Sequence, residues 1–488
     1  MKLKKLIHNI DNIEVKGSKD VEVKGLCQDS KLVKPGDLFI ARKGKVFDGT
    51  HFIPEAIATG AQCVLSDIYN PFYSKTTQII TKDIKKTSVQ IADRFYQSPH
   101  KDLFMVGVTG TNGKTTTSYL IKHILDSVDK HAGVIGTNGY LLKDSFLQAQ
   151  RTTPDTISCL KLLKEMQNKS LSSCVMEVSS HALDQSRVDC IDFDVAVFTN
   201  LTHEHLDYHG TMENYLVSKQ KLFSLLEKSE KENKCAIVNL DDPYGNQISE
   251  NYTGATLTYA IANQADVRAE NIELSAEKTS FDLHYQDTVQ KISIPLVGRF
   301  NVYNVLAAIS FALHIQIPLE KISEILSQFS LVNGRMERVN EYKECAVFID
   351  YAHTPDALEN ILLSLKELKT GKIFTVFGCG GARDKEKRPK MAKISESLSD
   401  FTFVTSDNPR SEDPNKIIEE IVLGFSKKDF LIESDRKLAI EKALEMATSN
   451  DIVVIAGKGH EKTQVYSHKT IPFDDREVVL SLKEGVNS

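Results

Sequence analysis

The sequence predicts an α/β protein of several domains, built on doubly wound parallel sheets. From residue 104 onward, short apolar runs typical of buried strands alternate with helical patterns. One of these strands breaks at a glycine-rich turn that leads into a helix. Polar loops follow the other strands, where open α/β sheets bind their ligands. At 488 residues the chain is too long for a single hydrophobic core.

Composition narrows the class of protein. With 41% apolar and 26% charged residues it is typical of a soluble globular protein, and a net charge of −6 argues against a nucleic-acid-binding face. No apolar stretch approaches the ~18 residues of a membrane-spanning helix. The eight cysteines include no C-x-x-C pair, which favours reduced thiols in a cytoplasm. We therefore expect a cytoplasmic protein without nucleic-acid partners or membrane insertion.

The first predicted domain, residues 1–98, alternates short β-like runs with turns. Pro35-Gly36-Asp37 predicts a turn, Leu38–Ala41 a strand and Asp48-Gly49 another turn. Taken alone, this segment indicates a half-buried sheet with polar loops.

The second predicted domain, residues 99–333, begins with FMVGVTGTNGKTTT. Phe104–Val108 predicts a buried strand, the turn starts at Gly110, and a helix begins near Thr115. Such a turn and helix N-terminus form an anion cradle, in which Lys114 reaches terminal phosphates and the Thr115 hydroxyl holds Mg²⁺. The match to G-x-x-x-x-G-K-[ST] is imperfect, because Val108 stands where the first glycine belongs. A glycine-rich turn with a surface lysine remains the alternative to an ATP site.

The rest of this domain repeats the strand and helix pattern, and polar residues follow two of the strands: Glu177 to His181 and Asn200 to His209. The predicted strands are Ser173–Val178, Val195–Thr199, Ala236–Asn239, Thr256–Ala260 and Ile292–Val297, and the predicted helices are Ile157–Met166 and Asn301–Leu313. The third domain, residues 334–488, predicts strands at Ala346–Ile349, Ile373–Phe377, Phe401–Thr405 and Ile452–Ala456, each ending in a polar loop.

The segment THEHLDYHG contains a possible metal site, with His203, His205, Asp207 and His209. It nearly matches the zinc signature of metallo-β-lactamase-type hydrolases, but Tyr208 replaces a required histidine. The other interpretation places one histidine with Glu177 around a nucleotide-bound Mg²⁺, for which histidine is an unusual ligand.

Eight motifs in order resemble one family: GTNGKTTT, MEVSSHAL, NLTHEHLDYHG, GRFNVYNVLAA, DYAHTPDAL, GCGGARDKEKRP, DNPR and AGKGHE. The chain resembles the Mur ligases of peptidoglycan synthesis, and among them those that add the third stem-peptide residue to UDP-MurNAc-L-Ala-D-Glu. The resemblance implies three domains, with a central P-loop parallel-sheet ATPase domain and a Rossmann-like C-terminal domain. It implies a monomer with small-molecule substrates: ATP, the UDP-sugar dipeptide and meso-diaminopimelate.

The resemblance also assigns roles in forming an amide through an acyl phosphate. It implies Lys114, His205 and Lys219 as catalytic residues, and Thr115, Glu177, His205 and a CO₂-derived carbamate on Lys219 as Mg²⁺ ligands. For Asn301 and Asn304, which share a helix face, helix capping is the alternative role. The ATP-binding residues that it implies are Gly110, Thr111, Asn112, Gly113, Lys114, Thr115, Thr116, Asn301, Asn304, Arg335, Asp350 and His353.

The other substrates take two further sets of residues by the same resemblance. The UDP-MurNAc-dipeptide set is Ser30, Lys45, Val46, Phe47, Thr152, Thr153, Ser179, Gln185 and Arg187. The diaminopimelate set is Arg383, Asp407, Asn408, Pro409, Arg410, Gly457 and Glu461. Pro409 stiffens its loop, so that Arg410 can offer a bidentate fork to the carboxylate that L-lysine lacks. A folylpolyglutamate synthase, a Mur ligase for another residue, and a non-catalytic or hydrolytic protein of this fold remain alternatives.

Overall fold

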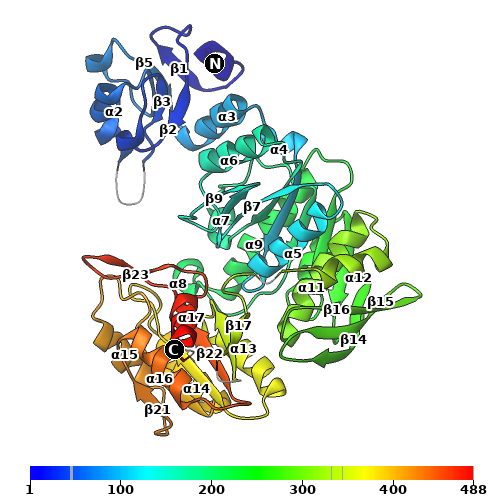
Figure 1. Cartoon of the computed structure of the whole chain (residues 1–488). Coiled ribbons are helices and arrows are strands. Elements are labelled where there is room, and N and C mark those ends of the chain that lie inside the picture. Colours follow the sequence, from blue (N-terminus) through cyan, green and yellow to red (C-terminus); the bar gives the residue numbers. More distant parts are fainter. Residues whose placement is uncertain (44–47, 331, 343–344, 487–488) are drawn as a thin grey trace.

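Three large sheets follow one another along the chain (Figure 1). The computed structural model describes residues 1–43, 48–330, 332–342 and 345–486, so the predicted site loop Lys45–Phe47 lies outside the described residues. Each sheet falls within one of the ranges 1–98, 99–333 and 334–488, and we retain these ranges as proposed domain boundaries. In Figure 1 the blue N-terminal part and the yellow-to-red C-terminal part each lie beside the cyan-to-green central part.

The N-terminal sheet has the strand order β1-β5-β4-β3-β2. Its strands are parallel except β1, which pairs antiparallel with β5. The predicted strand Leu38–Ala41 is β3, one residue earlier than expected and buried throughout. The strands are β1 (Ile13–Lys16), β2 (Gly25–Cys27), β3 (Asp37–Ile40), β4 (Cys63–Ser66) and β5 (Thr77–Thr81), and the α-helices are α1 (Leu3–Leu6), α2 (Ile53–Thr59) and α3 (Ile84–Tyr96).

The central sheet has the order β16-β15-β14-β13-β12-β11-β6-β10-β7-β8-β9. The neighbours from β7 to β14 in this order are parallel, as predicted. Antiparallel hairpins extend both edges, because short turns join β7 to β8 and β15 to β16. The strands are β6 (Phe104–Thr109), β7 (Ala132–Gly136), β8 (Gly139–Leu142), β9 (Ser145–Leu147), β10 (Ser173–Glu177), β11 (Val195–Phe198), β12 (Cys235–Asn239), β13 (Ala255–Ala260), β14 (Val267–Leu274), β15 (Thr279–Tyr285) and β16 (Thr288–Ile294).

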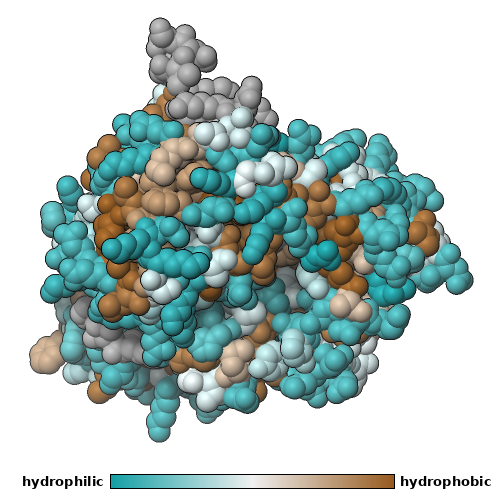
Figure 2. Space-filling view, turned by 90° about the horizontal axis from the view of Figure 1, so that it is seen from below, coloured by the Kyte–Doolittle hydropathy of each residue, from teal (hydrophilic) through white to brown (hydrophobic). Residues whose placement is uncertain are grey.

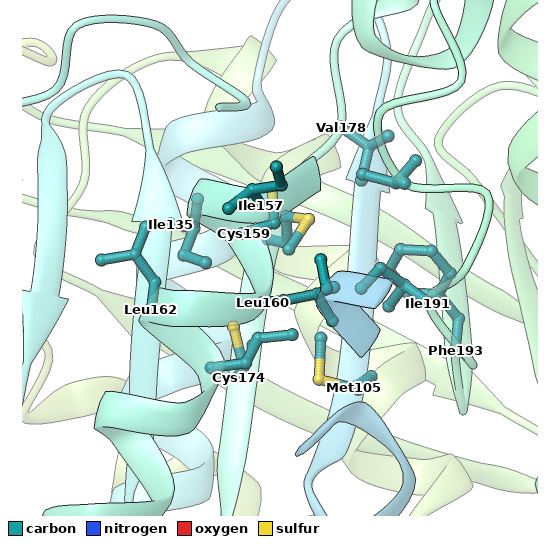
Figure 3. Packing of buried hydrophobic residues seen from close by; sticks show 14 of the residues in the cluster. Met105, Ile135, Ile157, Cys159, Leu160, Leu162, Cys174, Val178, Ile191 and Phe193 are labelled. Carbon is teal, nitrogen blue, oxygen red and sulfur yellow. The ribbon is translucent and has the colours of Figure 1, made fainter. Parts of the chain in front are cut away.

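Helices cover both faces of this sheet, which is why β6 reads as an unbroken apolar run. Met105 faces one hydrophobic cluster, where Leu160 of α6 and Cys174 of β10 pack near it (Figure 3). Val106 and Val108 belong to the cluster under α5 and α11 on the opposite face. The helices are α4 (Pro99–Asp102), α5 (Lys114–Asp126), α6 (Thr156–Asn168), α7 (Ser180–Asp184), α8 (Leu206–His209), α9 (Met212–Lys228), α10 (Gly245–Asn251), α11 (Arg299–His314) and α12 (Leu319–Ser327).

The C-terminal sheet has the order β17-β18-β22-β19-β20-β21, parallel except for β17. The four predicted strands are β18, β22, β19 and β20, neighbours whose carboxyl ends therefore meet at one edge. The strands are β17 (Glu337–Tyr342), β18 (Cys345–Asp350), β19 (Ile373–Phe377), β20 (Phe401–Val404), β21 (Phe430–Ile432), β22 (Ile452–Ala456), β23 (Thr463–Val465) and β24 (Thr470–Pro472), and the helices are α13 (Pro355–Leu368), α14 (Lys387–Leu398), α15 (Pro414–Val422), α16 (Arg436–Met446) and α17 (Asp475–Val486).

The surface carries both polar and apolar residues. On the face shown in Figure 2, hydrophilic residues are interspersed with smaller apolar patches. Among the described residues, no helix combines the length and the hydropathy needed to cross a membrane.

Candidate active site

The glycine-rich turn connects the carboxyl end of β6 to the first residue of α5. Gly110 and Gly113 have φ angles of 153° and 84°. A Cβ atom at Gly113 would lie 2.3 Å from Asn304 Oδ1, and one at Gly110 would lie 1.8 Å from Thr199 Oγ1. Both positions therefore require glycine. Val108, the departure from the sequence motif, lies inside β6 with its side chain in the core, so the turn itself does not depend on a glycine there.

Two lysines converge on this turn. Lys114 Nζ donates hydrogen bonds to the carbonyl oxygens of Gly110 at 2.9 Å and Thr111 at 2.7 Å. Lys219, on α9, donates to the same Gly110 oxygen at 2.7 Å, and only 1% of its surface is exposed. Burial lowers the pKa of Lys114. Burial, and then the charge of Lys114, lower the pKa of Lys219 well below its ordinary value. The site therefore raises the neutral fraction of Lys219 above that of an ordinary lysine.

Glu204 lies among the cationic groups of the site, and the sequence interpretation did not single it out. Its Oε1 atom lies 3.8 Å from His205 Nε2 and 4.0 Å from His353 Nε2. Burial opposes ionisation of this carboxyl, but His205, His353 and the two lysines hold its pKa below the ordinary value. The available signal was its place directly before His205 in the loop after β11.

The remaining histidines of that segment do not form a zinc site. His209 packs against the ring of Tyr215, with centroids 5.0 Å apart, and its Nε2 lies 3.0 Å from the Ser180 hydroxyl. Across the described part of the chain there is no group of three or more His, Cys, Asp or Glu residues that could hold a metal. The zinc-hydrolase interpretation therefore has no ligand cluster to support it there.

The oxygen atoms of side chains near the turn are of the kind that bind the Mg²⁺ ion of a nucleotide. Glu177, at the end of β10, is fully buried and accepts hydrogen bonds from the Thr137 amide and hydroxyl at 3.0 and 2.9 Å. The Thr115 hydroxyl accepts a hydrogen bond from Arg335 Nη2 at 3.1 Å. Carboxylate and hydroxyl oxygens are the ligands that Mg²⁺ prefers, with the nucleotide phosphates completing its shell. His205, in a left-handed conformation with φ 57°, precedes α8.

A cavity of about 520 Å³ lies between the turn and the C-terminal sheet. Asn301 Nδ2 donates to the carbonyl of Val297, just before α11, at 2.8 Å, and Asn304 Nδ2 donates to Asn301 Oδ1 at 2.9 Å. Gly298 is the N-cap residue of α11 and no side chain in the described part of the chain caps that end, so the capping role does not hold for Asn301, which lies within the helix and lines the cavity. Of the predicted ATP-binding residues, those that line this cavity are Asn112, Gly113, Thr116, Asn301, Asn304, Arg335 and Asp350.

Asp356, at the start of α13, joins the C-terminal part to the glycine-rich turn. Its Oδ2 atom accepts hydrogen bonds from the Asn112 side-chain amide and, at 3.2 Å, from the Thr202 hydroxyl. Together with the contact of Arg335 to Thr115, these bonds hold the two parts together around the cavity. The sequence interpretation missed Asp356, which carries no signal except its place in DYAHTPDAL.

A larger cavity, about 1420 Å³, separates the N-terminal and central sheets. Ser30 and Gln185 line it, and basic side chains including Arg42 and Arg151 face it. The other predicted residues form a hydrogen-bond network that leads to Glu177. Arg187 donates to the Thr153 carbonyl at 2.7 Å and to Gln185 Oε1. The Thr153 hydroxyl donates to the Glu177 carbonyl and accepts from the Ser179 amide, and the Thr152 and Thr137 hydroxyls lie 3.0 Å apart.

A third cavity, about 190 Å³, contains the predicted amino-acid site. Its walls come from the loop after β11, with Glu204 and His205, and from the loops after β20 and β22. Arg410 Nη1 donates to the Gly381 carbonyl at 3.0 Å, which leaves its other nitrogens available. His353 lies here rather than among the residues that line the nucleotide cavity. The predicted residues that line this third cavity are His205, His353, Arg383, Asp407, Asn408, Arg410, Gly457 and Glu461.

Comparison with known proteins places the chain in one family. Residues 108–312 match the Mur ligase middle domain, 334–459 the Mur ligase glutamate ligase domain, and 22–94 the catalytic domain of the Mur ligase family. Two similar proteins, both named UDP-N-acetylmuramoyl-L-alanyl-D-glutamate–2,6-diaminopimelate ligase, come from Chlamydia caviae (45% identical, covering 98% of both chains) and Caldanaerobacter subterraneus (41%, covering 99% of both). A solved structure of the same name is 32% identical, with a TM-score of 0.70 over 100% of this chain and 99% of that one. The chain therefore belongs to the Mur ligase family.

Proposed function

We propose that this protein is an ATP-dependent ligase that adds meso-2,6-diaminopimelate to UDP-MurNAc-L-Ala-D-Glu, in the cytoplasmic synthesis of peptidoglycan precursors. The names of its relatives over the full chain support this activity. One structural observation supports it most directly: the cavity lined by Arg410 and Glu461 also contains Glu204 and His205, and Glu204 lies within electrostatic reach of Lys114. An amine bound there would meet a carboxylate activated at the phosphate loop. We expect the enzyme to act as a monomer.

The chemistry has two steps. The terminal phosphoryl group of ATP passes to the free carboxylate of the UDP-sugar dipeptide, and ADP leaves. The amine of the incoming amino acid then attacks the acyl carbon, inorganic phosphate leaves, and the nitrogen loses a proton as the amide forms. Phosphoryl transfer depends mainly on positioning and charge neutralisation. Lys114 and the N-terminus of α5 supply positive charge where the phosphate charge develops.

Thr115, Glu177 and His205 would hold Mg²⁺, which neutralises phosphate charge when bound. We propose that Lys219 becomes a carbamate by reaction of its neutral amine with CO₂ and then serves as a further anionic ligand. Its burial supports this role, because burial favours the neutral amine that the reaction needs.

Arg410 would select the amino acid. meso-Diaminopimelate carries a distal carboxylate that L-lysine lacks, and a guanidinium binds a carboxylate through two parallel hydrogen bonds. With L-lysine the partly buried arginine would have no carboxylate partner, a situation that can reject an analogue by roughly 10⁴–10⁵-fold. Asp407, Asn408 and Pro409 shape the loop, and Arg383, Gly457 and Glu461 complete the pocket.

An isotope experiment tests the proposed function. The enzyme is incubated with ATP, meso-diaminopimelate and UDP-MurNAc-dipeptide labelled with ¹⁸O in its glutamyl carboxylate. We expect ADP, the tripeptide product and one ¹⁸O atom in the released phosphate, because the acyl phosphate transfers a substrate oxygen. Reactions without the amino acid are the control and should yield no tripeptide. Absence of tripeptide, or phosphate without ¹⁸O, would contradict the proposal.

A further inference from the structure

Lys458 is a buried cation beside the amino-acid cavity, and the roles proposed above do not use it. It follows β22 in the loop that leads to Glu461, and none of its surface is exposed. Its Nζ atom lies 3.2 Å from Asn408 Oδ1, 3.0 Å from Glu461 Oε2 and 2.7 Å from the Thr463 carbonyl oxygen. Three acceptors satisfy all three donors of the ammonium group, so Lys458 is fixed in place.

The same network fixes one oxygen of Glu461. Its Oε2 atom accepts hydrogen bonds from Lys458 and, at 2.7 Å, from the side-chain amide of Asn408. The Glu461 side chain is 28% exposed and lines the amino-acid cavity. Asn408 Oδ1 also accepts from the Val465 amide at 2.9 Å. The network thus joins the loop after β20, the loop after β22 and strand β23.

We infer that Lys458 is a positioning residue of the amino-acid pocket. Its hydrogen bond fixes one oxygen of the Glu461 carboxylate, so that the other oxygen is directed towards the substrate ammonium group. The inference rests on the proposed function, in which Glu461 receives that ammonium. Loss of the Lys458 charge would leave a partly buried carboxylate without its cation and would leave Asn408 Oδ1 with the Val465 amide as its remaining donor, so the Glu461 carboxylate would move or bind water instead.

A purely structural lysine would behave differently from a positioning one. If Lys458 only stabilised the C-terminal fold, its loss would lower thermal stability and change the KM values of all three substrates together. If it acts through Glu461, its loss raises KM for diaminopimelate alone. Its effect also shrinks once Glu461 no longer carries a charge, because coupled residues are not additive.

The experiment compares Lys458→Met, Glu461→Gln and the double variant with the unaltered enzyme. Residues that orient metal ligands by hydrogen bonds typically contribute about 10–100-fold to affinity or activity, and Lys458 would orient Glu461 by the same kind of contact. We therefore expect Lys458→Met to raise KM for diaminopimelate by about tenfold or more, with KM for ATP and for the UDP-sugar dipeptide nearly unchanged. In the Glu461→Gln background the same substitution should change KM by much less. Lys369→Met, which removes a partly exposed lysine paired with Asp400, is the matched control.

Three results would overturn the inference: an unchanged KM for diaminopimelate, an equal rise for all three substrates, or fully additive effects in the double variant. If Lys458→Met does not fold, Lys458→Gln replaces it, since its amide can still donate to Glu461 and a smaller rise confined to diaminopimelate is expected. Failure of the proposed function itself is seen separately, because the unaltered enzyme would then form no tripeptide with diaminopimelate.

Discussion

Replacing Lys219 by alanine should abolish ligation while leaving the fold intact. An amine with the ordinary pKa of 10.5 is neutral in about 0.3% of molecules at pH 8, and each unit by which the pKa falls raises that fraction about tenfold. Lys219 is buried and its pKa lies well below 10.5, so a much larger fraction can react with CO₂. Loss of the resulting anion should lower turnover by about 10²–10³-fold or more.

The assay measures tripeptide formation by Lys219→Ala with and without short-chain carboxylates. Acetate or formate can enter the space left by the side chain and replace the carbamate, so partial recovery is expected. Lys221→Ala is the matched control, because Lys221 lies two residues further along α9 and its side chain is 43% exposed and pairs with Asp184. Native mass spectrometry should show a CO₂ adduct of about 44 Da on the unaltered protein that the alanine variant lacks. Near-normal turnover of Lys219→Ala without added carboxylate would refute the reasoning.

Four further changes have defined outcomes. Lys114→Ala should lower turnover by about 10²–10³-fold with an unchanged circular dichroism spectrum, and near-normal turnover would remove the lysine from the mechanism. Arg410→Ala should lose most of the preference for diaminopimelate over L-lysine in competition assays. Asp356→Ala removes the hydrogen-bond acceptor for Asn112 and Thr202, so small-angle scattering should show a larger radius of gyration for this variant than for the unaltered enzyme, both with ATP bound. An unchanged radius of gyration would contradict the role of Asp356 in joining the two parts. Hydrogen bonding by Arg388 holds the pKa of Glu412 at about 2, below its ordinary 4.5, so that stabilisation is present above pH 4.5 and is lost as the pH falls towards 2. Glu412→Gln should therefore lower the unfolding temperature more at pH 7 than at pH 3.

The strands of both α/β sheets could be predicted because burial on two faces leaves a strong apolar signal. Ile373–Phe377 and Ile452–Ala456 have the predicted bounds, and Phe104–Val108 is extended by one residue. The antiparallel hairpins at the edges of the central sheet were not predicted. Their exposed strands, such as β16 and β9, alternate polar and apolar residues weakly, and the turns that set their direction are only two residues long.

The candidate site also contains some residues that could be predicted from the sequence and others that could not. Lys114 stands in a motif whose spacing predicts chemistry, and it lies at the glycine-rich turn. The role of Arg410 was predicted from the family resemblance of DNPR, and Arg410 lines the third cavity. Glu204, Asp356 and Lys458 had no such signal, because their positions depend on loops that are far apart in the sequence and meet only at the edges of two sheets. A glutamate before a histidine, or an aspartate after a proline, is too common a pattern to identify them.

The most direct test of the account is a competition between meso-diaminopimelate and L-lysine for the unaltered enzyme. The enzyme is given ATP, UDP-MurNAc-L-Ala-D-Glu and equal concentrations of both amino acids, and mass spectrometry quantifies the two tripeptides. The account predicts product that contains diaminopimelate in excess by roughly 10⁴-fold or more, the range expected when a site built for a polar partner binds an analogue that lacks it. Equal amounts of the two products, or product with L-lysine alone, would contradict it.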